Sequence, residues 1–87
     1  METKQNLNQL EIESEIDMMQ PDVSVTFKYY ELEIETNQDK TFSLRYKFLS
    51  RDISEWILKD NNYVREWKTI KGVKKYIKTK LKHMTEQ

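Results

Sequence analysis

Two runs of alternating apolar and polar residues flank Asn37-Gln38-Asp39, and this pattern restricts the middle of the chain to an antiparallel hairpin. A three-residue loop is a common connection between such strands. The pairs expected on the inner face are Ile34 with Phe42, Leu32 with Leu44, and Tyr30 with Tyr46. On the outer face the expected pairs are Glu31 with Arg45, and Tyr29 with Lys47. A slip of one residue would turn the apolar side chains to the wrong face, so the pattern selects this register.

The segment Val23–Thr36 is rich in β-branched and aromatic residues, which predicts a long strand. Its alternation changes phase in the middle, because apolar side chains up to Tyr29 share one face and those from Tyr30 onward share the other. A β-bulge near these two tyrosines would reconcile the halves. Pro21 and Asp22 precede the strand and break the chain.

The segment Leu10–Met18 alternates strictly, with apolar residues on one face and mostly carboxylates on the other. A period of two predicts a half-buried strand, and a disordered acidic arm is the alternative. A helix is not expected, because it would place these apolar side chains on opposite sides. Residues 1–9 offer little to bury and are expected to form a flexible N-terminal arm.

Asp60-Asn61-Asn62 separates Ser54–Lys59 from Tyr63–Trp67, which predicts a second hairpin. A helix over residues 52–67 remains the alternative, because Asp52 followed by Glu55 fits a capping box.

The segment Thr69–Met84 is the expected helix, with Thr69 as its N-cap. Its apolar side chains recur at three- and four-residue spacing and line one side. These residues are Ile70, Val73, Ile77, Leu81 and Met84. Gly72 weakens the helix by up to ~1 kcal/mol relative to alanine.

The predicted fold is α+β: an antiparallel meander of four or five strands, with one amphipathic C-terminal helix packed on one face. A chain of 87 residues makes a single domain, expected over residues 10–87. All ten aromatic residues lie between Phe27 and Tyr76, which places the core there. The absence of cysteine excludes disulfides and thiolate metal sites. No apolar run approaches the ~20 residues of a membrane span, and a cytoplasmic location is expected.

Residues suited to catalysis are scarce. The only histidine, His83, falls at the end of the expected helix, where a positive side chain is favoured. A single glycine excludes a glycine-rich phosphate loop. Carboxylates on the outer face of a strand are solvated and make poor general acids. We therefore expect a protein that is not an enzyme and needs no cofactor. A carboxylate metal site is the weaker alternative, because the regular spacing is typical of a sheet face.

Charge is divided between the two halves of the chain. Residues 1–40 carry ten acidic residues against three lysines, or −7, and residues 41–87 carry twelve Lys or Arg against five acidic residues, or +7. The net charge of zero is therefore a cancellation. Such a division favours contact with charged partners, or between copies of the chain.

An acidic face is the first candidate binding surface. It comprises Glu11, Glu13, Glu15, Asp17, Glu31, Glu33 and Glu35. Alternate residues of a strand lie ~6.6 Å apart, close to twice the ~3.4 Å phosphate rise of one DNA strand. Such a row could imitate a nucleic-acid backbone. The simpler interpretation is a solvated sheet face, partly neutralised by Arg45 and Lys47.

A lysine ridge on the expected helix is the second candidate surface. It comprises Lys71, Lys74, Lys75, Lys78 and Lys82. Lysines act as point charges, so the ridge could follow phosphates without reading sequence. The aromatic residues Trp56, Tyr63 and Trp67 could stack on bases, although tryptophans in a small protein are more often core. The alternative is a ridge that serves solubility or pairs with the acidic N-terminal segment.

One segment carries a local resemblance. Trp56-Ile-Leu-Lys-Asp-Asn-Asn-Tyr-Val-Arg-Glu-Trp-Lys-Thr69, followed by a lysine-rich helix, resembles a unit of the arm-type DNA-binding domains of phage integrases. In those domains a three-stranded sheet docks on DNA. The acidic segments before residue 56 depart from that pattern, and no functional residues are carried over.

The leading hypothesis is a non-enzymatic regulator or inhibitor of the kind found in phages and mobile elements. Its acidic face would bind a protein with a basic surface. The alternative is a nucleic-acid-binding accessory protein that uses the lysine ridge. A third hypothesis is self-association of the acidic and basic faces. We expect a monomer or weak homodimer and no membrane partner.

Overall fold

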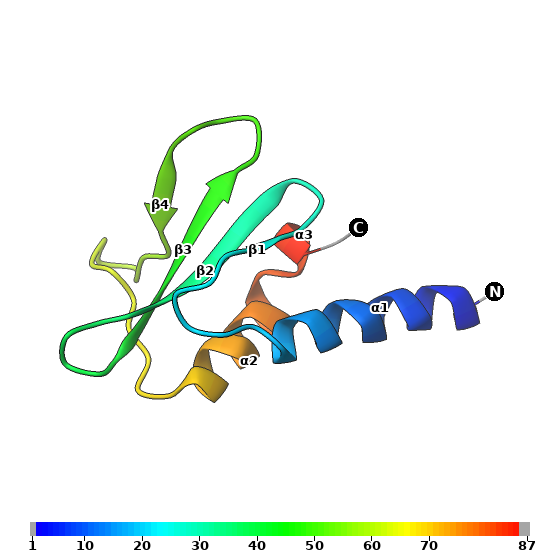
Figure 1. The fold of residues 1–87 in the computed structure, drawn as a ribbon, viewed down its shortest axis with the longest axis horizontal. Helices are drawn as coiled ribbons and strands as arrows, with labels where there is room; N and C mark the ends of the chain where they lie inside the picture. The colour runs from blue at the N-terminus through cyan, green and yellow to red at the C-terminus, as the bar shows by residue number, and fades with distance from the viewer. Residues whose placement is uncertain (1, 86–87) are drawn as a thin grey trace.

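The computed structural model describes residues 2–85, with side chains from residue 10 onward. Its elements are α1 (Glu2–Asp17), β1 (Val25–Thr26), β2 (Tyr30–Thr36), β3 (Phe42–Phe48), β4 (Ser54–Trp56), α2 (Ile70–Lys80) and α3 (Lys82–Thr85). The strands form one antiparallel sheet in the order β1-β2-β3-β4. Helix α2 packs on one face of this sheet and α1 packs against α2 (Figure 1). The predicted α+β meander with a C-terminal helix on one face is confirmed.

The core lies between the sheet and the two longer helices. Leu32, Ile34 and Leu44 of the sheet have no exposed surface, and neither do Val73 and Ile77 of α2. These residues follow the alternation of the strands and the three- to four-residue spacing of the helix. Within residues 2–85, no helix has the length and apolar character needed to cross a lipid bilayer.

The β2–β3 hairpin keeps the predicted faces, but its register differs from the prediction by two residues. Ile34 lies opposite Leu44, and Leu32 lies opposite Tyr46. The loop is Gln38-Asp39-Lys40, one residue later than predicted, because Lys40 adopts the left-handed conformation (φ 68°) that closes such a loop. Asn37 N donates to Thr41 O at 2.8 Å across it. On the outer face, Glu33 rather than Glu31 now lies opposite Arg45, and Glu31 rather than Tyr29 lies opposite Lys47.

The predicted long strand over Val23–Thr36 is two strands joined by a tight turn. Phe27 N donates to Tyr30 O at 2.7 Å, and β1 folds back on β2 so that Val25 lies opposite Leu32. The change of phase at Tyr29 is therefore a reversal of the chain and not a bulge.

The predicted strand over Leu10–Met18 is wrong, because the segment belongs to α1 up to Asp17 and Met18 lies in the turn that follows. Ile12, Ile16 and Met19 are buried at positions i, i+4 and i+7, which is the spacing of one helical face. Leu10 and Met18 are 60% and 75% exposed. The flexible arm expected over residues 1–9 stays a prediction, because residue 1 lies outside the described residues and residues 2–9 are described by their backbone alone.

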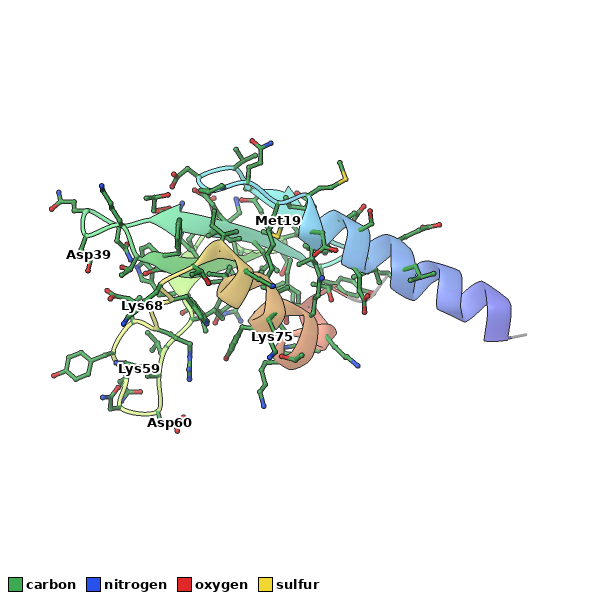
Figure 2. All side chains as sticks on the ribbon, turned by 90° about the horizontal axis from the view of Figure 1, so that it is seen from below. Met19, Asp39, Lys59, Asp60, Lys68 and Lys75 are labelled. Atoms are coloured by element: carbon green, nitrogen blue, oxygen red, sulfur yellow. The ribbon has the colours of Figure 1, made fainter. Side chains whose placement is uncertain are left out.

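The second hairpin is confirmed in its loop and pairing, and the alternative of a helix over residues 52–67 is wrong. Its predicted strands are shorter than expected: β4 ends at Trp56, and Leu58 and Val64 form only an isolated bridge. Lys59 N donates to Tyr63 O at 2.8 Å, and Asn62 adopts a φ of 68°, so this loop repeats the geometry of the first. Figure 2 shows Lys59 and Asp60 on a loop that projects from the body. The chain then returns to the sheet, where Trp67 and Phe42 exchange two backbone hydrogen bonds of 2.8 Å.

Helix α2 begins as predicted. Thr69 Oγ1 accepts a hydrogen bond from Gly72 N at 3.0 Å, which satisfies one of the free amides of the first turn. The predicted single helix is broken at Leu81, and α3 follows it so that Leu81 and Met84 are both buried. A Cβ on Gly72 would lie 3.4 Å from Trp67 Cδ1, so this glycine permits a close approach of the helix to Trp67.

Candidate functional site

The basic residues of α2 line a groove on the side of the helix that faces α1. The groove has a volume of about 490 Å³ and is lined by Asp17, Ile70, Lys71, Lys74, Lys75, Lys78 and Thr79. The structure thus brings together four of the five residues of the predicted lysine ridge. The fifth, Lys82, lies beyond the helix break, on α3.

The C-terminus of α1 occupies one end of this groove. Lys74 Nζ donates to Asp17 O, and Lys78 Nζ forms an ion pair with Asp17 Oδ1, both at 2.5 Å. A helix C-terminus carries unpaired carbonyls and partial negative charge, which ammonium groups satisfy. The alternative in which the lysine ridge pairs with the acidic N-terminal segment is therefore confirmed for Lys74 and Lys78. Lys71 and Lys75 are exposed, and no ion pair is recorded for them among the described side chains.

A second groove, the aromatic cleft, lies on the other side of α2. It has a volume of about 300 Å³ and is lined by Arg65, Trp67, Gly72, Lys75, Tyr76, Thr79 and Lys80. The rings of Trp67 and Tyr76 have centroids 5.1 Å apart, and the Arg65 guanidinium lies 5.2 Å from the Tyr76 centroid. Lys75 lines both grooves, and Figure 2 shows it on the side of α2 turned away from the sheet.

The predicted acidic face is divided between two layers of the fold. Glu11, Glu13, Glu15 and Asp17 belong to α1, in the helical layer. Glu31, Glu33 and Glu35 alternate with the buried residues of β2 and therefore lie on the opposite face of the sheet. The seven carboxylates do not form one row, so the spacing comparison with a nucleic-acid backbone applies only to β2.

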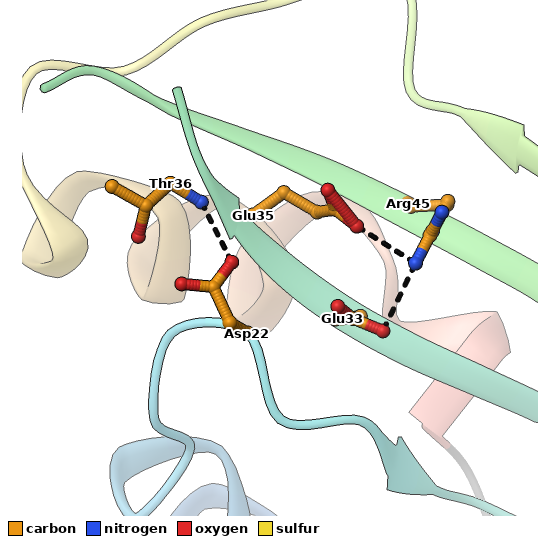
Figure 3. A network of polar contacts seen from close by, with 5 residues as sticks. All are labelled: Asp22, Glu33, Glu35, Thr36 and Arg45. Carbon is orange, nitrogen blue, oxygen red and sulfur yellow. Dashed lines mark hydrogen bonds and ion pairs between the residues drawn. The ribbon is translucent and has the colours of Figure 1, made fainter. Parts of the chain in front are cut away.

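Arg45 contacts two of the three carboxylates of β2 and offsets one of their negative charges. Arg45 Nη2 lies 3.1 Å from Glu33 Oε1 and 2.7 Å from Glu35 Oε2 (Figure 3). Its guanidinium also lies 5.6 Å from the ring centroid of Trp56 on β4. This arrangement matches the simpler interpretation from the sequence, a sheet face neutralised across the strands.

Three carboxylates come close together at this place. One oxygen each from Asp22, Glu33 and Glu35 lies within 4.8 Å of the others. Asp22 Oδ1 already accepts a hydrogen bond from Thr36 N at 3.0 Å, and Arg45 supplies the positive charge (Figure 3). The cluster is therefore held by protein groups.

The surroundings of this cluster shift the pKa of Glu35. Burial raises the pKa of the Glu35 carboxyl above its usual value; Arg45 opposes this effect, and Glu33 and Asp22 reinforce it. Glu35→Gln is therefore expected to raise the free energy of unfolding near pH 7, because folding disfavours the ionised group. A raised carboxyl pKa makes the folded state gain stability as pH falls through that pKa. The difference between variant and wild type should therefore shrink towards about pH 4 in urea unfolding.

Asp39 offers a control of opposite sign. Its Oδ1 accepts hydrogen bonds from Thr41 Oγ1 and Thr41 N at 2.6 and 3.1 Å, and these bonds hold its pKa below the usual value. Asp39→Asn should therefore lower stability near pH 7 and lose this effect as pH falls through the folded pKa. If Glu35→Gln were less stable than wild type near pH 7, the Arg45 contact would outweigh burial and crowding.

A third cavity lies at the other end of the sheet. It has a volume of about 290 Å³ and is lined by Tyr30, Tyr46, Phe48, Arg51, Ile53, Glu55 and Met84. Tyr46 Oη donates to Glu55 Oε2 at 2.7 Å, and this bond raises the pKa of the Tyr46 hydroxyl. His83 is exposed, with its ring edge-on to Tyr30 at 6.4 Å.

Four residues of the aromatic cleft were missed by the sequence analysis: Arg65, Tyr76, Thr79 and Lys80. A signal for them exists in the chain. Arg65 and Trp67 are two apart in an extended segment, and Tyr76 and Lys80 are four apart in a helix, so each pair projects from one side of its element. The packing of the hairpin beside α2, which joins the two pairs, is not readable from spacing.

Comparisons of the chain with models of known protein families, with curated proteins and with solved structures found no significant match. What the protein does must therefore be inferred from its own surface.

Proposed function

We propose that this protein is a non-enzymatic accessory protein that binds nucleic acid through the basic surface of α2. The observation that carries the proposal is that Lys71 and Lys75 are exposed and form no ion pair among the described side chains. Both line the first groove, and Lys75 also lines the second. By contrast, two of the acidic residues of β2 pair with Arg45. The positive surface is the one left available for a charged partner.

The spacing of these lysines suits a chain of phosphates. Lys71 and Lys75 are four residues apart, so their Cα atoms are separated by a rise of about 6 Å along the helix. Lysine side chains are flexible point charges and tolerate the difference from a phosphate repeat. Contacts of this type add affinity and salt dependence without sequence preference.

Oligonucleotide binding by fluorescence anisotropy, at about 50 and 200 mM salt, tests the proposal. Replacing Lys71 and Lys75 together by glutamine should weaken binding. It should also reduce the slope of log K against log salt by about 1.8 on duplex DNA or about 1.4 on single strands. The matched control replaces Lys28 and Lys59, which are exposed on two loops, and changes the net charge equally. Absence of binding at low salt, or an equal effect of the control pair, would refute the proposal.

The second candidate function is the protein-binding regulator with an acidic contact surface. It is favoured by the position of Glu31, Glu33 and Glu35 on the face of the sheet opposite the buried residues that pack against α2. Charge reversal at these residues should abolish partner binding under this function and spare nucleic-acid binding. Charge reversal at Lys71, Lys74, Lys75 and Lys78 should do the converse. Self-association of the two faces would instead appear as a particle size that depends on concentration and salt.

A further inference from the structure

We infer that the nucleic acid taken by this surface is single-stranded, and that one of its bases enters the aromatic cleft beside Trp67, Tyr76 and Arg65. This inference rests on the proposed function and names the class of ligand for it. Its starting point is that the two grooves are neighbours on α2 and share Lys75 and Thr79 in their lining.

The cleft presents flat surfaces of the kind on which a base stacks. The rings of Trp67 and Tyr76 lie 5.1 Å apart at an interplanar angle of 52°, so they form an angled wall and not a closed stack. The Arg65 guanidinium lies over the Tyr76 ring, at 5.2 Å from its centroid, and adds a second planar group to the cleft. Stacking on aromatic rings and on arginine is the usual way in which proteins hold unpaired bases.

Hydrogen-bonding groups in the cleft lack acceptors. Arg65 Nε is buried and has no hydrogen-bond partner among the described residues. No ion pair is recorded for Arg65 or for Lys80 among the described side chains. Nε itself is shielded from solvent, so a ligand with oxygen or ring-nitrogen acceptors would meet the remaining guanidinium nitrogens of the half-buried Arg65.

The absence of a side chain on Gly72 keeps the cleft open beside Trp67. A Cβ at this position would lie 3.4 Å from Trp67 Cδ1 and 3.3 Å from Thr69 Oγ1, which is within van der Waals contact. The cleft is shallow and largely open to solvent, and its volume of about 300 Å³ gives room for one base lying against its wall.

The geometry distinguishes single strands from duplexes. In a duplex the faces of the bases are stacked on one another, so a duplex could reach Lys71 and Lys75 through its phosphates but could not fill the cleft. A single strand could do both: its backbone would follow the lysines of α2 and one unstacked base would lie against Trp67. Single-stranded DNA and RNA share this chemistry.

Trp67 can report directly on the cleft. The chain has two tryptophans, so Trp56→Phe leaves Trp67 as the only one. This variant is titrated with oligo-dT, with oligo-rU of the same length, with a duplex of that length, and with polyphosphate as a polyanion without bases. We expect one or both single strands to quench Trp67 fluorescence, and the duplex and polyphosphate to leave it unchanged. The dT and rU titrations show which sugar is preferred.

Arg65→Lys is the matching variant, because it keeps the charge and removes the planar group. It should weaken single-strand binding at least about fivefold and change polyphosphate binding less than twofold. Single-strand binding with unchanged Trp67 fluorescence, or with full affinity in Arg65→Lys, would overturn the inference and leave the proposed function standing. If none of the polyanions bound, both the inference and the proposed function would be contradicted.

Discussion

Ile16→Ala is expected to lower the free energy of unfolding by about 2–5 kcal/mol, the usual loss when a buried isoleucine is truncated. Ile16 is 1% exposed and belongs to the single core cluster that joins α1, α2 and the sheet. A chain of 87 residues has a total stability of roughly 4–13 kcal/mol, so this one change removes a large fraction of it. Urea unfolding followed by circular dichroism measures the effect.

Met18→Ala is the matched control for this prediction. Met18 is 75% exposed, so its replacement should change the free energy of unfolding by no more than about 0.5 kcal/mol. In the strand that alternation suggested, Ile16 and Met18 would share the buried face and both replacements would be costly. Equal losses would therefore count against the helical docking of α1.

Phe27→Ala is expected to cost about 3–5 kcal/mol, the second of the two largest effects. Phe27 is 2% exposed and lies at the turn that returns β1 along β2. For a domain of this size each kcal/mol corresponds to about 4–8 °C in Tm, so thermal unfolding should shift by more than 10 °C.

Tyr29→Ala tests the same turn from its other side. Tyr29 is 55% exposed, and its recorded backbone bond, from Leu49 N to Tyr29 O at 2.9 Å, does not need the side chain. We expect a loss of less than about 1 kcal/mol. A bulged strand would keep Phe27 and Tyr29 on one face. Similar losses in the free energy of unfolding for the two variants would therefore support the bulge and contradict the turn.

The hairpins show how far local sequence specifies this fold. Alternation alone placed Leu32 and Ile34 on the inner face, where they are fully buried. It did not determine which residue of the loop takes the left-handed conformation. The structure gives that position to Lys40, and a loop moved by one residue moves the pairing by two, which preserves both faces. At Asn62 the favourable residue type and the required position coincide, and the prediction there is confirmed.

The prediction for the N-terminal segment was wrong because its sequence was assigned the two-residue period of a strand and not the period of a helix. The alternating acids over Leu10–Met18 imitate a strand, yet only Ile12 and Ile16 of that run are buried, and Met19 beyond it completes the helical stripe. A window that ends at residue 18 cannot contain that stripe. The helix that packs against α1 is α2, more than fifty residues away. The complementary charges of the two segments indicated this pairing as an alternative, but they did not indicate that the N-terminal segment is a helix.

The candidate site was predicted in part. The helical spacing of the lysines was sufficient to place Lys71, Lys74, Lys75 and Lys78 on one side of α2. The aromatic cleft was not predicted, because its two halves come from Arg65–Trp67 and from the helix, and only the return of the chain to β3 at Trp67 brings them together.

Because α1 contacts α2, the helix made first cannot complete its packing until the later helix has been synthesised. Asp17 is 57 residues from Lys74, and ribosomes add about 5–20 residues each second, so α1 exists for roughly 3–11 s before its partner is made. During that interval the apolar side chains of Ile12, Ile16 and Met19 have no α2 to cover them, whereas the β2–β3 hairpin can already close. The carboxylates between those side chains keep the segment hydrated. Their negative charge also makes copies of the segment on different nascent chains repel one another, which limits association.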